Sequence, residues 1–197
     1  MSGKRVLDLT GELGVDTMFL VRTFHEAVSC EHDPLLCAVV EHNLKVSEVA
    51  NVVVKYGDSI SMLAEYPDDF FDWIFVDPER CEEGHRSIAL ETASPDVFAS
   101  HDLLLCHERV CIKVSPALEI SGLKKLLPAL HTIVVVSVDR ECKEILLLLE
   151  RAYHSDGPVQ VKAVCLNADS EGITDVVGGN GEVLRVVATV VKEYLCL

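Results

Sequence analysis

The chain has 197 residues, of which 49% are hydrophobic and 25% are charged, so it is long enough for one α/β domain and too apolar for a disordered segment. Its formal net charge is −15 and its sequence pI is near 4.8. This acidity argues against tight binding of a duplex phosphate backbone by the chain alone, because such binding needs a basic surface.

Eight cysteines are spread along the chain without a C-x-x-C pair, a pattern typical of reduced thiols in a cytoplasmic protein. The fragments Cys30 to His32 and Cys81 to His85 lack a matching second half, so no metal site is expected. The longest apolar run, at residues 145–149, is far too short to span a membrane, and no membrane partner is expected. The remaining histidines, His107 among them, show no triad-like pairing and are expected at the surface.

Apolar strands and helices alternate through the first half of the chain. Asp33 followed by Pro34 is a strong helix start, because aspartate caps a helix well and proline suits its first position. Helices are expected at 15–24, from Pro34 onward and at 60–65, and strands at 5–10, 27–30, 51–55 and 72–76.

The second half begins in the same way and then changes. A strand at 109–114, a helix at 118–127 and a strand at 132–138 are followed almost at once by a strand at 144–150. Because parallel strands need a long crossover, this short connection predicts an antiparallel hairpin. Residues 159–167 and 182–191 are expected to form further antiparallel strands around the Gly-rich turn at 178–181.

Right-handed crossovers would build these elements into a doubly wound, mostly parallel α/β sheet with an antiparallel C-terminal hairpin. Residues 1–151 are expected to be the core domain, and residues 152–197 additional antiparallel strands. Ligands of such sheets bind at the carboxyl ends of the strands. The polar residues expected at that edge are Asp8, Thr10, Glu31, Asp58, Asp77, Lys113 and Ser115.

The stretch "DLTGELGVDT" joins the first strand to the first helix. Gly11 and Gly14 would allow a tight turn and a close approach of the backbone to a ligand. Glu31 ends the second strand, where a carboxylate commonly holds a ribose, and Asp58 ends the third, where it could accept from an adenine amino group. Together these positions predict a nucleoside-type cofactor.

The acidity of this loop separates two cofactor classes. Glu12 and Asp16 would repel a pyrophosphate, and the G-x-G-x-x-G pattern of dinucleotide enzymes is incomplete. S-adenosylmethionine carries no phosphate and has two cationic groups, so it suits an acidic loop better. A nicotinamide-dependent oxidoreductase is the alternative with weaker support.

Six segments in order resemble the class I S-adenosylmethionine-dependent methyltransferases: "VLDLTGELGVDT", "CEHD", "YGD", "FDWIFVDPER", "IKVSPALEI" and "VSVDRECKEILLLLE". Within that class the chain is similar to a bacterial subfamily with a D-P-x-R fourth motif and a C-terminal THUMP-like domain. The resemblance runs from about residue 5 to residue 151. It implies a seven-stranded, Rossmann-like sheet with a reversed last strand, and a methyltransferase activity.

The resemblance also implies roles for individual residues. The cofactor loop would consist of Asp8, Thr10, Gly11, Gly14 and Asp16. The ribose and adenine would be held by Glu31, His32 and Asp58. The residues implied to lie at the methyl acceptor are Asp77, Pro78, Arg80, Lys113 and Ser115.

Two departures from the family pattern bear on activity. Glu12 and Glu79 stand where the family usually has small residues, which makes a non-catalytic binding or scaffold domain an alternative. The acceptor and the oligomeric state are open at this stage. The THUMP-like domain of the family implies RNA modification, with RNA bound through flanking domains that this chain would lack.

Overall fold

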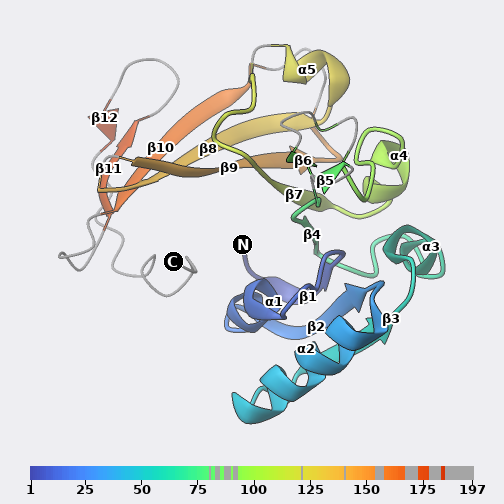
Figure 1. Ribbon diagram of the computed structural model, residues 1–197. Helices are drawn as coiled ribbons and strands as arrows, with labels where there is room; N and C mark the ends of the chain where they lie inside the picture. Colours follow the sequence, from blue (N-terminus) through green and yellow to red (C-terminus); the bar gives the residue numbers. More distant parts are fainter. Residues whose placement is uncertain are drawn as a thin grey trace. The chain divides into compact units, whose positions relative to one another are not determined.

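The computed structural model describes residues 1–79, 81–82, 85–86, 90, 93–120, 122–139, 141–153, 158–166, 173–177 and 183–184. The chain forms two compact units, Met1–Val110 and Cys111–Leu195 (Figure 1). The core boundary expected at residue 151 lies inside the second unit and stays a prediction.

The first unit contains a parallel sheet of four strands, as the sequence predicts. These strands are β1 (Gly3–Asp8), β2 (Phe24–Glu31), β3 (Val52–Tyr56) and β4 (Trp73–Val76). They pair in the order β3-β2-β1-β4, which matches the first four strands of the 3-2-1-4-5-6 order of a doubly wound sheet. All four therefore end at the same edge, and the segments that follow them converge there.

Two helices follow the first two strands. Helix α2 (Pro34–Val46) begins as predicted: the Asp33 side chain accepts the backbone N–H groups of Leu35 and Leu36. Figure 1 shows α2 running along β2 and β3. Helix α1 (Val15–Leu20) is shorter than expected, because Phe24 belongs to β2 and pairs with Gly3 of β1.

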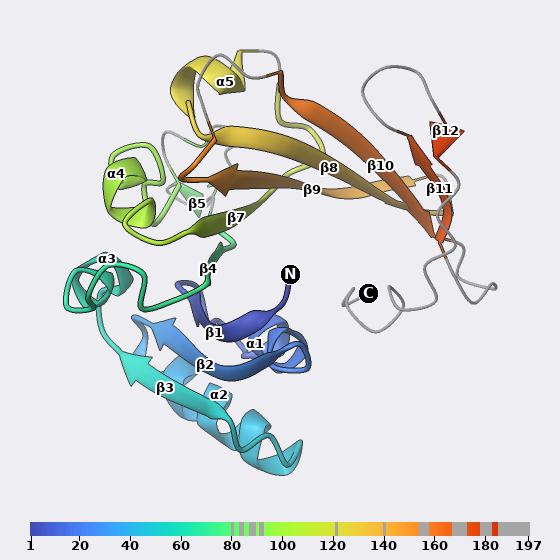
Figure 2. The same cartoon turned by 180° about the vertical axis from the view of Figure 1, so that it is seen from behind.

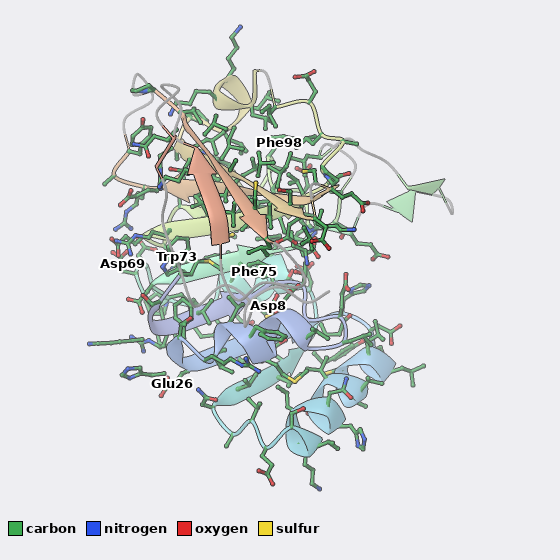
Figure 3. All side chains as sticks on the ribbon, turned by 90° about the vertical axis from the view of Figure 1, so that its left-hand side faces the viewer. Asp8, Glu26, Asp69, Trp73, Phe75 and Phe98 are labelled. Carbon is green, nitrogen blue, oxygen red and sulfur yellow. The ribbon has the colours of Figure 1, made fainter. Side chains whose placement is uncertain are left out.

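Apolar strands form the core of the first unit, and one buried polar ring packs beside them. Trp73 and Phe75 come from β4 and are buried (Figure 3). The surface position expected for His107 is wrong, because only 1% of the residue is exposed. Its Nδ1 accepts the backbone N–H of Phe71 at 3.4 Å, and the two rings meet edge to face. The hydrogen bond from Phe71 and the ring contact thus take the place of the water contacts that a surface histidine would have.

Three short elements complete the first unit. They are α3 (Ser59–Leu63), the two-stranded pair β5 (Cys81–Glu82) and β6 (His85–Arg86), and α4 (His101–Leu104). The six cysteines whose side chains are described are thiols and do not form disulfides with one another. In the described part of the chain, none of the helices has both the length and the apolar composition needed to cross a membrane.

The second unit is built around a long hairpin, which Figure 2 shows from behind. Strands β8 (Leu130–Val138) and β9 (Glu141–Glu150) are antiparallel, which confirms the predicted hairpin. Strand β10 (Gln160–Leu166), however, pairs with β8 in parallel, so the antiparallel pairing expected for this segment is wrong on that side. Its other neighbour, β11 (Ile173–Val177), is antiparallel.

The remaining elements are β7 (Arg109–Val114), helix α5 (Leu123–Leu126) and β12 (Val183–Leu184). The strand at 109–114 is found where it is predicted. The helix expected at 118–127 is shorter than predicted among the described residues. Its N-cap is Gly122, so α5 covers four residues. The expected sheet of seven strands is too small, since ten strands are assigned to the described residues apart from the separate pair β5 and β6.

Candidate functional site

A pocket of about 840 Å³ lies in the first unit, among the segments that follow β1, β2, β3 and β4. This volume falls within the range of known small-molecule sites. The position is the one expected for a parallel sheet, because neighbouring strands leave their carboxyl ends at a common edge. The described residues that line the pocket belong to the first unit.

The buried carboxylate of Asp8 is hydrogen-bonded to the loop after β1. Asp8 is fully buried, and its two oxygens accept hydrogen bonds from the Thr17 hydroxyl at 2.5 Å and from the Thr10 backbone N–H at 3.0 Å. The Thr10 hydroxyl lies 3.4 Å from the same carboxylate and accepts the backbone N–H of Asp77 at 2.8 Å. Asp8 therefore connects the start of α1 (Figure 3) to the loops that follow β1 and β4.

Burial dominates the titration of Asp8. Desolvation raises its pKa to about 7, although the hydrogen bonds from Thr17 and Thr10 act in the opposite direction. Desolvation, followed by the charge of Asp8, also raises the pKa of the neighbouring Cys30 thiol to about 12. Cys30 lines the pocket, but a thiol with such a pKa stays protonated and is a poor nucleophile.

Gly11 and Gly14 are needed because the loop packs closely against two other elements. A Cβ on Gly11 would lie 2.6 Å from the Ser29 hydroxyl and 3.0 Å from the Cys30 carbonyl oxygen. Gly14 begins α1 with φ 79°, and a Cβ there would lie 2.9 Å from Cγ1 of Val40 on α2. The loop therefore packs closely against β2 and α2. Its other face, called the outer face here, is directed toward the pocket.

Glu12 lies on that outer face. Its side chain is exposed and lines the pocket, and its backbone has φ 41°. Positive φ favours glycine, since a Cβ is crowded in the left-handed region. The small residue that the family pattern has here thus matches the backbone, and this chain keeps the conformation while adding a carboxylate.

Glu31 ends β2 with its carboxylate almost entirely buried. Its Oε1 accepts the backbone N–H of Asp33 at 2.8 Å and lies 3.2 Å from Nδ1 of His32. The His32 side chain is 75% exposed. Both residues line the pocket. The Glu31 carboxylate, already fixed by a hydrogen bond, therefore lies beside the exposed imidazole of His32.

The end of β3 contributes an aromatic and an acidic side chain. Tyr56 is 63% exposed, and Asp58 caps α3 by accepting the backbone N–H of Ser61 at 2.7 Å. Hydrogen bonding from Ser61 lowers the pKa of Asp58, and the nearby His32 acts in the same direction. Asp58 is therefore ionised at neutral pH and occupies the pocket wall next to Tyr56.

The segment after β4 forms the opposite wall. Asp77 lines the pocket, and its backbone is fixed by the bond to Thr10 described above. Glu79 pairs with Ser94 through two backbone hydrogen bonds of 2.8 and 2.9 Å. This pairing brings Pro95 and Asp96 to the pocket as well.

The structure places the predicted residues in four groups. Those that line the pocket are Thr10, Glu31, His32, Asp58 and Asp77. Those that belong to the same unit but are not among its described lining residues are Asp8, Gly11, Gly14, Asp16 and Pro78. Lys113 and Ser115 belong to the second unit, where the Ser115 hydroxyl accepts the backbone N–H of Ala117 at 3.2 Å. Arg80 lies outside the described residues.

Sequence reasoning missed part of the lining. Tyr56 precedes the predicted Asp58 by two residues, and its position at the end of β3 could have indicated that it lines the pocket. Ser94, Asp96 and Ser100 had no such signal, because they reach the pocket through the distant backbone pairing with Glu79. The turn residues Ser94 and Pro95 indicate only a change of chain direction.

The pocket is strongly acidic. Among the residues that the structure describes, six carboxylates line it: Glu12, Glu31, Asp58, Asp77, Glu79 and Asp96. No lysine or arginine is among the described residues that line it, and His32 is the single lining residue of that set able to become cationic. Such a wall disfavours phosphates and carboxylates and favours ligands with positive charge and hydroxyl groups. The described residues also contain no group of three or more side chains suited to hold a metal ion.

No protein-family model matches this chain, and no curated protein matches it in sequence. Solved structures do share its fold. A protein from Porphyromonas gingivalis W83, named as a candidate methyltransferase, matches with a TM-score of 0.76 and 23% identity over 93% of this chain and 44% of its own. The chain therefore spans less than half the length of that protein.

Two further structures with methyltransferase names share the fold at lower identity. The human methyltransferase 10 domain containing protein has a TM-score of 0.63 and 13% identity, over 78% of this chain and 74% of its own. TrmK from M. capricolum, solved with the cofactor product S-adenosyl-homocysteine, has a TM-score of 0.55 and 8% identity, over 77% and 63%. The chain thus has the fold of these methyltransferase structures.

Proposed function

We propose that this chain is a methyltransferase core whose first unit binds S-adenosylmethionine in the acidic pocket. The observation that carries the proposal is the set of six carboxylates, without lysine or arginine among the described lining residues, at the ends of four parallel strands. A dinucleotide would bring its pyrophosphate against this wall. A phosphate-free sulfonium nucleoside brings a cation instead. The shared fold and the complex of TrmK with S-adenosyl-homocysteine support the same choice.

The strand order gives the ligand a direction in the pocket. Glu31 at the end of β2 binds the ribose hydroxyls, because its buried carboxylate is already held by Asp33 N–H and keeps acceptor capacity. Asp58 and Tyr56 at the end of β3 then flank the adenine. The arm that carries the sulfur consequently extends the other way, toward the loop after β1 and toward Asp77.

In a methyl transfer the protein mainly positions the methyl donor and the acceptor. When bound in this pocket, S-adenosylmethionine would supply an electrophilic methyl group for in-line transfer to an acceptor. Asp77 orients the acceptor and takes the proton that the acceptor releases. The bond from Asp77 N–H to the Thr10 hydroxyl fixes the backbone of this residue relative to the cofactor loop. Pro78 follows it and is buried, which further restricts the segment.

The acceptor class is proposed from the sequence resemblance, which points to structured RNA. The acidic pocket itself offers the RNA phosphates no described lysine or arginine partner. Binding of RNA would therefore depend on residues beyond this pocket, and Asp77 would contact only the base that is methylated.

A second candidate function is a non-catalytic binding domain with a methyltransferase fold. The observation in its favour is Glu12, a carboxylate inside the pocket on a backbone that suits glycine. Replacing Glu12 with glycine separates the two functions. A rise in S-adenosylmethionine affinity of about 100-fold or more would mark the natural loop as impaired, since a steric clash or charge repulsion of about 3 kcal/mol corresponds to a change of that size.

Calorimetric titration with S-adenosylmethionine tests the proposal. We expect saturable binding to the natural chain and none of NADH. Glu31→Gln should weaken binding about tenfold or more, because hydrogen bonds to a charged group contribute about 1.5–3 kcal/mol. Glu26→Gln is the matched control, since Glu26 lies exposed on the same strand and away from the pocket, and it should leave affinity unchanged. Absence of binding at millimolar ligand, or equal binding of NADH, would overturn the proposal.

A further inference from the structure

Glu12 occupies the end of the pocket at which the reacting sulfur of the proposed ligand would lie. The ribose and adenine positions at Glu31 and Asp58 belong to β2 and β3, and the strand order continues from β2 to β1 and β4. A ligand bound in this direction places its sulfur beside the loop after β1. Glu12 is the acidic residue of that loop that lines the pocket.

Within the part of the chain that the structure describes, the other charged residues that line this end of the pocket have the same sign as Glu12. Asp77 and Glu79 line the pocket from the segment after β4. His32 lies at the end of β2 instead, with its Nδ1 3.2 Å from Oε1 of Glu31. The described lining residues therefore place several carboxylates at this end, and their interaction with a ligand depends on the charge that the ligand carries there.

The donor and the product of a methyl transfer differ at that atom by one unit of charge. The sulfonium of S-adenosylmethionine is cationic, whereas the thioether of S-adenosylhomocysteine is neutral, and the adenine, ribose and amino-acid groups of the two are the same. We propose that Glu12 is a specificity-determining residue that makes the pocket bind the sulfonium donor more tightly than the thioether product. This inference rests on the proposed function of the pocket.

The backbone at Glu12 supports a role for the side chain rather than for the fold. With φ 41°, glycine or asparagine would adopt the conformation of this residue more easily than glutamate. The chain nevertheless has a carboxylate here, and that carboxylate lines the pocket. Glu48 also has a positive φ, of 56°, and is exposed, but it is not among the residues that line this pocket. Glu48 is therefore a matched control for both the backbone and the charge.

The test is a comparison of dissociation constants for S-adenosylmethionine and S-adenosylhomocysteine, measured by calorimetry on the whole chain. We expect the natural chain to bind the donor more tightly by on the order of tenfold, the size of one partly screened charge interaction at close range. Glu12→Gln keeps the shape and removes the charge, so it should shrink this ratio about fivefold or more. Glu48→Gln should leave the ratio as it is.

Salt and backbone strain provide two further readouts. Raising the ionic strength should shrink the ratio in the natural chain and have little effect in the Glu12→Gln variant. Glu12→Gly should shrink the ratio as Glu12→Gln does, while both Glu12→Gly and Glu48→Gly raise the melting temperature by relieving positive φ. Tighter binding of the product than of the donor, or an unchanged ratio in Glu12→Gln, overturns the inference alone. Absence of binding of both ligands overturns the proposed function and the inference with it.

Discussion

The two units of the molecule each contain a short helix that begins at a left-handed glycine, and the two glycines are required to different degrees. Gly14 starts α1 with φ 79° and Gly122 starts α5 with φ 86°, and neither helix has a side-chain cap. A Cβ on Gly14 would lie 2.9 Å from Val40, whereas a Cβ on Gly122 would have nothing within 4 Å. At Gly14 both the positive φ and the close packing against Val40 favour glycine, whereas at Gly122 only the positive φ does.

The same contrast appears in charge and in buried polar groups. Residues 1–110 contain 21 acidic and 8 basic residues, a net charge of −13, while residues 111–197 contain 11 and 9, a net charge of −2. Of the buried polar residues that the structure describes, Thr132 belongs to the second unit, and the first unit has Asp8, Thr17, Ser29, Glu31 and His107. The acidic charge and the buried polar network thus accompany the pocket, and the second unit is stabilised mainly by apolar strands.

The largest predicted effect concerns the buried Asp8. Its pKa in the folded chain, about 7, is above its ordinary value of 3.8, so folding favours the protonated form. The contribution of Asp8 to stability is therefore fully present below pH 4 and is lost as pH rises to about 7, by up to about 4 kcal/mol. Urea unfolding of the natural chain and of Asp8→Asn at several pH values measures this slope, which the variant should lack.

Glu141→Gln is the control for this experiment, because Glu141 lies in the second unit and its side chain is 75% exposed. It should keep the slope of the natural chain. If the natural chain and Asp8→Asn show parallel pH profiles, the carboxylate is not the buried, desolvated group described here, and the contrast between the two units loses its main support.

The two glycines give the next largest effect. Gly14→Ala should lower the free energy of unfolding by about 3 kcal/mol, the sum of a left-handed backbone penalty and overpacking against Val40. Gly122→Ala should lower it by about 1 kcal/mol, because only the backbone penalty applies. Chemical denaturation of both variants checks the difference. Equal losses would show that the loop before α1 is no more tightly packed than the start of α5.

A smaller effect is expected at α2, which has the side-chain cap that α1 and α5 lack. Asp33→Ala should lower the free energy of unfolding by about 1 kcal/mol, since two backbone N–H groups lose their acceptor. Ser100→Ala is a useful reference, because Ser100 stands before α4 without a side-chain capping bond. A loss for Ser100→Ala as large as that for Asp33→Ala would contradict the assignment of the cap.

The smallest effect is predicted in the second unit. Ser115→Ala should change the affinity for S-adenosylmethionine by less than about twofold, because its hydroxyl bonds to the neighbouring Ala117 and the described pocket is lined by the first unit alone. Calorimetry on this variant beside Glu31→Gln makes the comparison. A tenfold loss for Ser115→Ala would extend the cofactor site into the second unit.

The sequence predicts best those features that depend on neighbouring residues. The start of α2 follows from Asp33 and Pro34, and the convergence of Glu31, Asp58 and Asp77 follows from strand ends that are recognisable one at a time. The hairpin of β8 and β9 follows from a connection too short for a crossover. These signals are local, and tertiary packing reinforces them.

Features set by distant partners were not predictable in the same way. The length of α1 depends on the pairing of Phe24 with Gly3, and the direction of β10 depends on its register with β8. Ser94 and Asp96 reach the pocket through the pairing of Glu79 with Ser94. Asp8 is expected in the cofactor loop, and the structure adds that it is fully buried and is not among the described residues that line the pocket. The strand-end pattern alone does not distinguish a buried carboxylate from an exposed one.

A crystal structure of the chain with S-adenosylhomocysteine bound is the most direct measurement of the central claim. The account predicts the ligand in the first-unit pocket, with its ribose hydroxyls at the Glu31 carboxylate, its adenine between Tyr56 and Asp58, and its sulfur beside Glu12. Ligand density at another site, or in this pocket with the sulfur directed toward Asp58, would contradict it.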